Sequence, residues 1–446
     1  MGRLGSVLVL LLATGSARAQ EASEDVVPGV PFKEGDVLTF EQLNKLKNYL
    51  PEQFWQNREY FFYEGMKIHV GPFFRKYPNA PEYEAVSARY AGQATIGKDG
   101  ALLNYTAGQP FSQIDCKGDP QAATKIIWNF MKRWEGDGSR SQWSYTYWDR
   151  GEQLPLYYEG TAKFIFMTNR VEPQYEANGA ALFKNDKRKE IQGVEVTAPF
   201  DARGILVMTY RYQSSEGPLE TSKNDDTWVY LPDLRRVRRI STAQRTDSVQ
   251  GTDFTRDDLR SFDGVPPQYT WECLGERDVI TPFSTTKLAY PYTDDYNFGP
   301  FGFSYAADNW EMRHAYVIRF HPRNEDHPYH HKDIYLDRET YEPLYSFAYD
   351  RKRELWKIIW HNHRYSEDWK GQTADRKDPN RKDGVWYSGW DGVKEADDIR
   401  VVSDIIVNVQ TGTGNRIEFW DNDGDPLPSK GKIRRYIDIG RLNKGR

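Results

Sequence analysis

From residue 141 onward, the apolar and aromatic residues of this chain recur at every second position. The segment 141–150 (SQWSYTYWDR) shows the pattern, and the segments 161–170 (TAKFIFMTNR) and 204–212 (GILVMTYRY) repeat it. A period of two places successive side chains on opposite faces of a β-strand, whereas a helix has a longer period. Each run is short and is bounded by Gly, Pro, Asn or Asp, which favour turns. Residues 141–446 are therefore predicted to form mainly β-sheet.

The connections between these runs determine how the strands pair. Several are too short to contain a crossover helix, so neighbouring strands are expected to be antiparallel. The chain shows no internal repeat and no low-complexity linker. We therefore expect an α+β, mainly β fold, in which a few helices cover one strongly curved antiparallel sheet.

Two helices are predicted before the sheet. In 39–50 (TFEQLNKLKNYL), apolar residues recur at helical spacing, with Thr39 as the N-cap and Pro51 after the last turn. The second helix is predicted at 119–134 (DPQAATKIIWNFMKRW), where the apolar residues form one broad stripe.

The passage between the two helices is rich in Pro and Gly, and we expect only short strands there, including 89–96. We expect residues 20–140 to form a helix- and loop-rich part that packs on the 141–446 sheet. Residues 20–446 would then form one integrated domain.

Residues 1–19 have the pattern of a secretory signal peptide. Arg3 supplies an early positive charge, the apolar run VLVLLLA follows, and Ala17 and Ala19 provide small residues before Gln20. The apolar run is too short to cross a bilayer as a stable helix. We therefore expect cleavage and a mature chain that begins near Gln20.

The charge and the cysteines restrict the partners of the exported chain. The full chain has 60 Lys and Arg residues against 65 Asp and Glu residues, and loss of Arg3 and Arg18 makes the mature chain more acidic. A nucleic-acid partner would require a basic surface, so we expect none. An oxidising export compartment allows Cys116 and Cys273 to form a disulfide. Because the sequence does not place their Cα atoms, the paired and free forms both remain open.

Most of the histidines are clustered, since seven of the eight fall between residues 314 and 363. On a strand, His361 and His363 point to the same face, where two imidazoles could bind zinc or copper. A metal site also needs a third ligand and supporting groups, which the sequence does not identify. The competing interpretation is that these histidines are exposed residues of a polar surface. We therefore assign no metal site and no cofactor.

Carboxylates lie near aromatic residues at several places, and a pair of carboxylates would suit a glycosidase. A chain with 65 acidic residues contains such neighbours by chance. No G-x-S-x-G, H-E-x-x-H or P-loop motif is present. A carbohydrate-active or metal-dependent enzyme is therefore our third hypothesis, and we predict a protein without catalytic residues.

A basic hairpin is predicted within 225–262, where an aromatic strand turns and returns through four arginines. On the returning strand Arg236 and Arg238 share one face, whereas Arg235 and Arg239 share the other. We expect that the four arginines do not all face solvent in a two-layer structure. One pair should face a covering element or the concave side of the sheet.

Two interpretations of these arginines remain open. Guanidinium groups are suited to hold carboxylates, phosphates or the carbonyl groups at helix ends. Alternatively, the returning strand is an exposed sheet edge that carries charge against pairing with another chain. Asp253, Asp257 and Asp258 follow the hairpin, and they are expected to be its ion-pair partners.

Several motifs resemble a known superfamily. WVYLPDLRRVRRI followed by GTDFTRDDL looks like the signature of outer-membrane lipoprotein-sorting proteins, the LolA/LolB-like superfamily. DIYLDRETYEPLYSFAYDRKRELWKI resembles the strand, turn and strand pattern of the same superfamily. LLNYTAGQPF, DPQAATKIIWNF and YWDRGEQLPLYY are similar to a longer family of exported bacterial proteins with this domain. The resemblance covers nearly the whole mature chain.

The resemblance implies an incomplete barrel, or half barrel, in the periplasm, with helices as a lid over an apolar cavity. It implies a carrier or accessory factor that binds lipids or hydrophobic compounds between the inner and outer membranes, without catalysis or cofactor. RND-type exporters, outer-membrane proteins and peripheral membrane contact are the implied partners. The hairpin would then be the central rib of the sheet. The candidate residues of the ligand site, its rim or a lid latch are Trp228, Tyr230, Arg236, Arg238, Arg239, Asp253 and Phe254.

The length of this chain departs from that of the small carriers, because the extra structure could fill the cavity. The alternative function is therefore a structural scaffold of an envelope export complex with a self-filled cavity. A cavity of about 300 Å³ or more on the concave face would favour ligand binding, and a packed interior would favour the scaffold.

Overall fold

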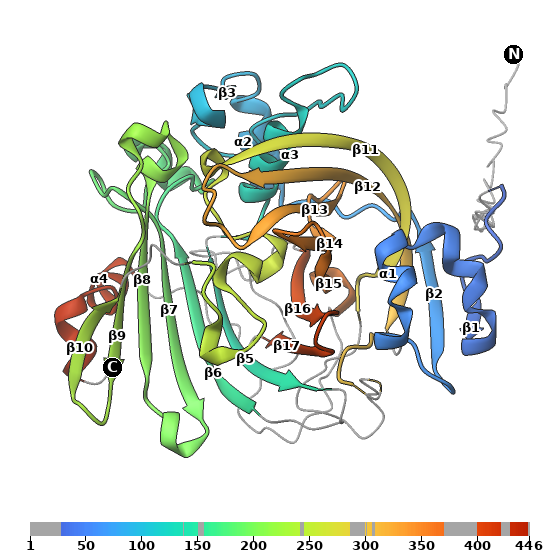
Figure 1. The fold of residues 1–446 in the computed structure, drawn as a ribbon. Helices are drawn as coiled ribbons and strands as arrows, with labels where there is room; N and C mark the ends of the chain where they lie inside the picture. Colours follow the sequence, from blue (N-terminus) through green and yellow to red (C-terminus); the bar gives the residue numbers. More distant parts are fainter. Residues whose placement is uncertain are drawn as a thin grey trace, which may run out of the picture.

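The fold of the chain is given by a computed structural model (Figure 1). The structure describes residues 28–136, 138–149, 156–240, 245–285, 301–305, 308–369, 399–420 and 429–444, together with Gly299. Within these residues, no helix is long and apolar enough to cross a membrane. The expected signal peptide, residues 1–19, lies outside the described residues.

One large sheet dominates the structure. Its strands are β1 (Val37–Thr39), β2 (Lys67–Phe73), β5 (Gly138–Trp148), β6 (Leu156–Phe166), β7 (Arg188–Ala198), β8 (Leu206–Tyr212), β9 (Asp226–Leu231), β10 (Arg236–Ile240), β11 (Tyr269–Pro282), β12 (Asn309–Pro322), β13 (Tyr329–Asp337), β14 (Pro343–Asp350), β15 (Leu355–Tyr365), β16 (Ile399–Asn408) and β17 (Thr413–Trp420). A separate small pair is formed by β3 (Thr95–Ile96) and β4 (Leu102–Leu103).

The order of the strands shows a sheet that does not close. It runs β1-β2-β12-β13-β14-β15-β16-β17-β5-β6-β7-β8-β9-β10, and β11 pairs with β12 beside this path. The described pairs are antiparallel apart from β2 with β12. Figure 1 shows that the sheet is strongly curved, so that it has a concave and a convex face. The predicted mainly β fold with one curved antiparallel sheet is therefore confirmed.

The four α-helices of the described residues lie in the first third of the chain and at its C-terminal end, whereas short 3₁₀ helices also occur between the strands. The α-helices are α1 (Glu52–Gln56), α2 (Pro81–Arg89), α3 (Ala122–Met131) and α4 (Lys430–Tyr436), and the 3₁₀ helices include η1 (Phe40–Tyr49), η9 (Arg256–Ser261) and η12 (Ile439–Lys444). The helix predicted at 39–50 is η1, and Thr39 caps it reciprocally with Gln42. The helix predicted at 119–134 is the shorter α3.

The strand predicted at 89–96 is wrong, because α2 already occupies the residues before it and only β3 is extended. Pro81 stands in the first turn of α2, where its missing N–H costs no hydrogen bond. Tyr83 and Val86 are buried three residues apart on one side of the helix. The helix has only nine residues, so its apolar pattern is short, and the prediction missed it.

The convex face of β12–β16 is covered by the N-terminal part of the chain. Trp310 and Trp360 are fully buried there, and the ring of Phe54 in α1 lies 4.8 Å from that of Trp360. Farther along the sheet, Ile433 of α4 and Ile437 just after this helix belong to a core with the convex side of β7–β9. The division of the chain at residue 140 stays a prediction.

The concave face of β11–β14 is covered by α3. Ile126 and Ile127 of this helix belong to one core with Ile318 of β12 and Ile334 of β13. Cys116, just before α3, is joined by a disulfide to Cys273 of β11. The structure therefore contains the paired form of the two cysteines that the sequence left open.

The packing predicts a contrast between two leucine substitutions. Leu344 of β14 has 0% exposure and Leu234 of the β9–β10 turn has 49%. Replacing Leu344 with Ala should lower the free energy of unfolding by about 2–5 kcal/mol, because it leaves a cavity. Replacing Leu234 with Ala should change it by less than about 0.5 kcal/mol. Urea unfolding followed by tryptophan fluorescence measures both, and equal losses would contradict the assignment of the core.

Candidate functional site

The segment 245–268, here called the plug, lies on the concave side of the sheet. In Figure 1 it is seen between the strands β7 and β8 and the strands β13–β17. Its helix η9 contacts β14, β15 and β16. The plug and α3 together cover the concave face of β11–β16.

One fully buried carboxylate joins the plug to the sheet. Asp258 accepts hydrogen bonds from Nζ of Lys332 at 2.9 Å and from Nζ of Lys357 at 3.0 Å. The hydroxyl groups of Tyr329 and Thr255 donate to the same carboxylate at 2.7 and 2.9 Å. Burial raises the pKa of Asp258, but the two ammonium groups outweigh it and hold this pKa well below its ordinary value. The carboxylate is therefore ionised and fully partnered.

A second buried contact has the geometry of a serine–histidine–aspartate triad. Ser261 Oγ lies 2.6 Å from Nε2 of His361, and Nδ1 of His361 lies 2.6 Å from a carboxylate oxygen of Asp404. All three residues have no measurable exposure, so no substrate can reach the serine in this conformation. Burial lowers the pKa of His361, against the opposing effect of Asp404. In this conformation the three groups fasten the plug to β15 and β16.

The expectation that His361 and His363 are exposed is wrong, since both are fully buried. They do share one face of β15, and Nε2 of His363 lies 3.6 Å from the carboxylate of Glu342. Burial lowers the pKa of His363 well below its ordinary value. The described residues contain no group of three or more side chains placed to hold a metal ion.

The β9–β10 hairpin lies at the edge of the sheet, so its expected place as a central rib is wrong. Arg235, Arg236, Arg238 and Arg239 are all exposed, which also contradicts the expectation that one pair is covered. The reason is that β10 has a neighbouring strand on one side only. The register does place Arg236 and Arg238 on one face, opposite Leu231 and Val229 of β9.

The expected ion pairs between the hairpin and the downstream acids are also wrong. Asp253 accepts hydrogen bonds from Asn408 and Thr413, and Asp257 pairs with Arg245 at 2.6 Å. Arg239 pairs instead with Asp226. The sequence did not single out Arg245, because nothing in its neighbours indicates that its half-buried side chain pairs with acidic residues of the plug.

The other candidate residues lie in two different places. Trp228 and Tyr230 face the convex core around α4, on the side of the sheet opposite Arg236 and Arg238. Phe254 belongs to the plug, and its ring lies 5.8 Å from that of Tyr145 on the concave face. The candidate residues therefore do not converge on one site.

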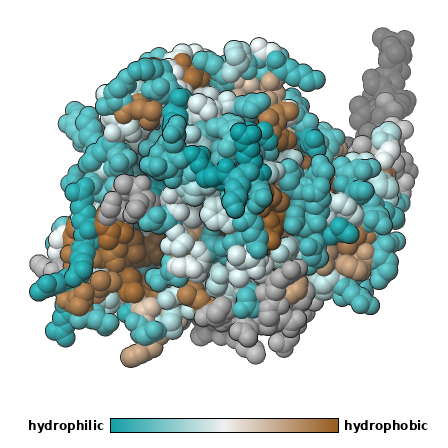
Figure 2. All heavy atoms as spheres, in the orientation of Figure 1, coloured by the Kyte–Doolittle hydropathy of each residue, from teal (hydrophilic) through white to brown (hydrophobic). Residues whose placement is uncertain are grey.

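The concave face of β6–β10 carries an apolar surface, here called the valine groove. Val194, Val207 and Val229 form one row across β7, β8 and β9, between Ala162 and Arg238. The three valines are half-buried. Figure 2 shows apolar side chains gathered over these strands, beside a hollow in the surface.

A second row extends the valine groove. Val196 bonds through its backbone to Ile205 at 2.9 Å, and Leu231 lies opposite Arg236. Toward β5, the ring of Trp143 lies directly over Gly160, where a Cβ atom would be only 2.4 Å from the indole. Only glycine therefore leaves room for this ring, which widens the apolar surface.

Charged residues close the valine groove at the end next to the plug. Arg211 of β8 contacts Asp263 at 2.6 Å, and Arg245 contacts the same carboxylate at 3.0 Å. Arg256 contacts Asp263 at 3.1 Å. The groove therefore has a charged end at the plug and an apolar part that reaches the edge strand β10.

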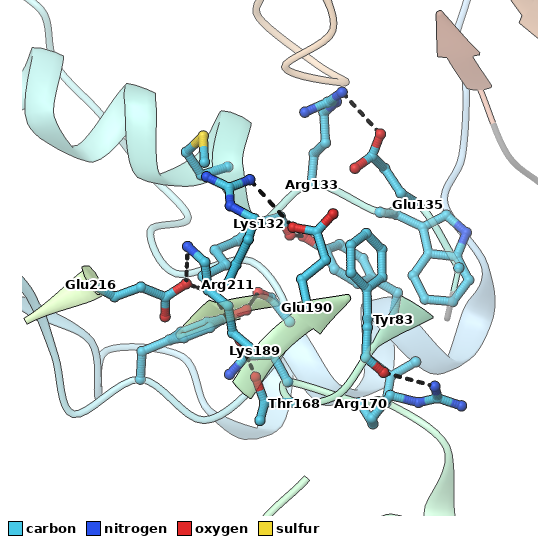
Figure 3. A pocket seen from close by; sticks show the side chains of 18 residues that line it. Tyr83, Lys132, Arg133, Glu135, Thr168, Arg170, Lys189, Glu190, Arg211 and Glu216 are labelled. Atoms are coloured by element: carbon cyan, nitrogen blue, oxygen red, sulfur yellow. Dashed lines mark hydrogen bonds and ion pairs between the residues drawn. The ribbon is translucent and has the colours of Figure 1, made fainter. Parts of the chain in front are cut away.

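A separate charged cavity lies at the end of α3 and holds about 90 Å³. Figure 3 shows Lys132 and Glu216 pointing toward each other there, and Glu216 lies 2.6 Å from Nζ of Lys132 and 3.1 Å from Nζ of Lys189. Burial raises the pKa of Glu216, but the two lysines outweigh it and lower this pKa to about 2. These charges are satisfied by one another.

The volumes of the cavities test whether the protein has the apolar ligand cavity that was expected beneath a lid. A second cavity, between the plug and β5–β8, holds about 80 Å³, and a third beside β11 holds about 220 Å³. All three are smaller than the roughly 300 Å³ at which a cavity would favour ligand binding, so the cavity volumes favour the scaffold. A ligand of acyl-chain size would therefore lie in the open valine groove or require movement of the plug.

The sequence carried a signal for the valine groove that the prediction did not use. In 192–198 (QGVEVTA) the valines alternate with polar residues on a strand of the predicted sheet. By contrast, nothing local shows that Asp258 meets two lysines more than seventy residues away.

Comparison with known proteins places the chain among related sequences. The model of the family described as "Protein of unknown function (DUF1329)" matches residues 38–380. A relative in Pseudomonas aeruginosa, the uncharacterised protein PA3922, is 23% identical over 300 residues. The match covers 64% of this chain and 61% of that relative, so the chain spans about three fifths of its length.

Solved structures with a similar fold include a DUF1329 family protein from Desulfovibrio piger, with 16% identity and a TM-score of 0.43 over 72% of this chain and 98% of that one. A putative outer-membrane lipoprotein-sorting protein domain from Vibrio parahaemolyticus has 18% identity and a TM-score of 0.42 over 72% and 97%. The LolA superfamily protein NE2245 from Nitrosomonas europaea has 12% identity and a TM-score of 0.36 over 69% and 96%.

The buried contacts of Asp258 predict a large and pH-dependent effect of Asp258→Asn. The variant leaves Lys332 and Lys357 without their carboxylate, so the free energy of unfolding should fall by about 3–5 kcal/mol near neutral pH. Because folding lowers the pKa of Asp258, its stabilisation is complete above about pH 4 and is lost as the pH falls further. The difference between wild type and variant should therefore shrink in acid.

Urea unfolding of both proteins at several pH values measures this difference. Asp247→Asn is the matched control, because Asp247 is exposed, and it should change the free energy of unfolding by less than about 0.5 kcal/mol. A constant difference at all pH values would show that Asp258 is not held by the lysines.

Proposed function

This chain belongs to the DUF1329 family, and we propose that it is a periplasmic protein that binds a lipid or another hydrophobic molecule in the valine groove. It would act as a carrier or accessory factor between the inner and outer membranes, without catalysis. The observation that carries the proposal is the row of half-buried Val194, Val207 and Val229 on an otherwise polar chain.

The apolar side chains of the groove give the driving force for binding. Each 100 Å² of apolar surface that a ligand and the groove remove from water contributes about 2.5 kcal/mol. Val196, Ile205 and Leu231 are half-buried beside the first row, so an extended acyl or isoprenoid chain has a continuous apolar surface to cover. A compact polar ligand has no such match.

The arginines on the concave side of β10 give a reason for an anionic head group. Arg236 and Arg238 lie opposite Leu231 and Val229 at the edge of the groove, and both are exposed. Guanidinium groups form strong, forked hydrogen bonds with carboxylates and phosphates. A ligand with an apolar chain in the groove would place its head group at this rim.

Two further parts of the proposal come from the sequence. The expected signal peptide supports export, and the lipoprotein-sorting motifs support traffic between the two membranes. RND-type exporters and outer-membrane proteins are the partners that the sequence resemblance suggests. The buried position of Ser261 supports the absence of catalysis, since its hydroxyl group has no access to a substrate.

A structural scaffold is the second candidate function, and the plug favours it. The plug and α3 occupy the concave face of β11–β16, and Asp258 and Ser261 fasten the plug there by buried hydrogen bonds. A protein of this kind would use its sheet as a rigid support and hold no ligand. Lipid extraction and native mass spectrometry of the purified protein separate the two functions, because a scaffold would be empty.

Ligand binding in the valine groove predicts a specific effect of charge. The double variant Val207→Asp/Val229→Asp should weaken binding of a hydrophobic fluorophore at least tenfold, because the ligand would desolvate the new carboxylates. Fluorescence titration measures the affinity. The control Val37→Asp carries one new carboxylate at an exposed valine and should bind normally. Equal binding by all three proteins would exclude the groove as the site.

The rim predicts a dependence on the head group. Arg236→Leu/Arg238→Leu should bind a fluorescent fatty acid about tenfold more weakly, since hydrogen bonds with a charged group contribute about 1.5–3 kcal/mol. Binding of the corresponding uncharged alcohol should not fall. The control Arg277→Leu/Arg353→Leu removes two exposed arginines, one on β11 and one in the β14–β15 turn, outside the groove, and it should match the wild type. A variant that fails to fold would identify the two arginines as structural.

A further inference from the structure

A group of exposed cations surrounds the edge of the sheet at β10, here called the basic corner. It consists of Arg235, Arg236, Arg238 and Arg239 of the hairpin and Lys430, Lys432, Arg434, Arg435 and Arg441 of the C-terminal helices, all of which are exposed. The helix η12 contacts both β9 and β10. In Figure 1, α4 lies beside β10 at one side of the molecule. Two segments far apart in the sequence therefore form one basic surface.

The basic corner contrasts with the charge of the whole chain. The formal net charge is −5, yet residues 429–446 contain seven Lys and Arg residues and one Asp residue. The rest of the protein is therefore strongly acidic. Such a separation of charge orients a molecule in an electric field and favours one direction of approach to an anionic surface.

Most cations of the basic corner remain available to a partner. Arg239 pairs with Asp226, and Arg441 lies 3.3 Å from Asp438. Among the described residues, no ion-pair partner is found for Arg235, Arg236, Arg238, Lys432 or Arg435. These five residues keep their charge exposed to solvent.

Protection of the sheet edge explains only part of this charge. Arginines on an edge strand prevent pairing with another chain, and this reason suffices for β10. It does not apply to Lys432 and Arg435, because they project from a helix that packs on the convex face through Ile433 and Ile437. A second reason is needed for the cations of α4.

Apolar side chains stand among the cations. Leu234 in the hairpin turn and Ile240 at the end of β10 are 49% and 45% exposed. Exposed cations next to exposed aliphatic side chains are typical of surfaces that rest on the head groups of anionic lipids. The valine groove opens toward the same strand, since its first row ends at Arg238.

We propose that the basic corner docks the protein on an anionic phospholipid bilayer. A bilayer presents charge over a broad surface, so it can meet cations from both sides of a sheet edge. An acidic protein is less well matched, because the cations of the corner are spread over a hairpin and the C-terminal helices rather than gathered on one element. Docking in this orientation brings the edge strand β10 and the adjoining end of the valine groove next to the lipid. The proposal does not depend on which molecule the groove holds.

Cosedimentation with vesicles tests the docking directly. The probes are vesicles that contain phosphatidylglycerol and vesicles of phosphatidylcholine alone. The wild-type protein should bind the anionic vesicles at low salt, and binding should fall as salt screens the charges. Each Lys or Arg residue near an anionic surface contributes about fivefold to partitioning. The variant Lys432→Gln/Arg435→Gln/Arg441→Gln should therefore bind the anionic vesicles at least tenfold more weakly.

The matched control removes three exposed lysines at the other side of the molecule. Lys47→Gln/Lys67→Gln/Lys352→Gln changes the net charge by the same amount, and it should retain binding to anionic vesicles within about twofold. Both variants should bind the hydrophobic fluorophore normally, so a failure of the groove proposal is recognised separately. An equal loss in the two variants would overturn the basic corner as the docking site.

Two other results would also overturn the proposal. Equal binding to both kinds of vesicle would show that charge does not direct the contact. Failure to bind anionic vesicles at low salt, together with binding to polyglutamate that the variant Lys432→Gln/Arg435→Gln/Arg441→Gln loses, would assign the basic corner to an acidic protein. Thermal unfolding of each variant establishes that the substitutions leave the fold intact.

Discussion

The position of the plug depends on the buried charge of Asp258. A carboxylate or an ammonium group without a partner is very costly inside a protein. Asp258 lies on the plug, whereas Lys332 and Lys357 lie on β13 and β15. Because the three charges are buried together, the sheet cannot keep its interior dry unless the plug is in place. In this half of the sheet, the concave face is therefore covered by a segment of the same chain, the plug.

The buried contacts of Asp258 with the two lysines fix the position of the plug more than they add to the stability of the fold. A buried ion pair is often no more stable than well-packed apolar residues of the same volume. A half barrel that opened freely to an apolar cargo would gain nothing from two lysines in its hollow. The valine row of β7–β9 differs from this region of the same sheet, because its central residues are valines and not buried charged residues. In the proposed function, the two halves of the concave face would therefore differ: the half under the plug is closed, and the half with the valine groove would contact the apolar ligand.

In this protein, the sequence predicts which segments form strands and turns better than it predicts where each strand lies in the sheet. The alternation in 141–212 is enough to predict strands, and the arginines of 235–239 are enough to predict a hairpin and the face that each side chain occupies. The order of the strands comes from distant pairings such as β17 with β5, which no local pattern encodes. The hairpin was therefore placed at the centre of the sheet although it lies at the edge. His361 was misjudged for the same reason, because its partners Ser261 and Asp404 lie 100 and 43 residues away.

The contact of Ser261, His361 and Asp404 shows why distances alone do not define a catalytic site. Arg260 and Ser261 have positive φ angles of 51° and 69°, which are unfavourable for residues other than glycine. The backbone N–H of Arg260 donates to Asp404 at 3.2 Å, and Ser261 is held by His361. The same groups that resemble a catalytic triad are therefore the groups that hold this turn of the plug in place. Since the turn would lose these restraints if the serine swung out to meet a substrate, the geometry favours a fastening role over a catalytic one.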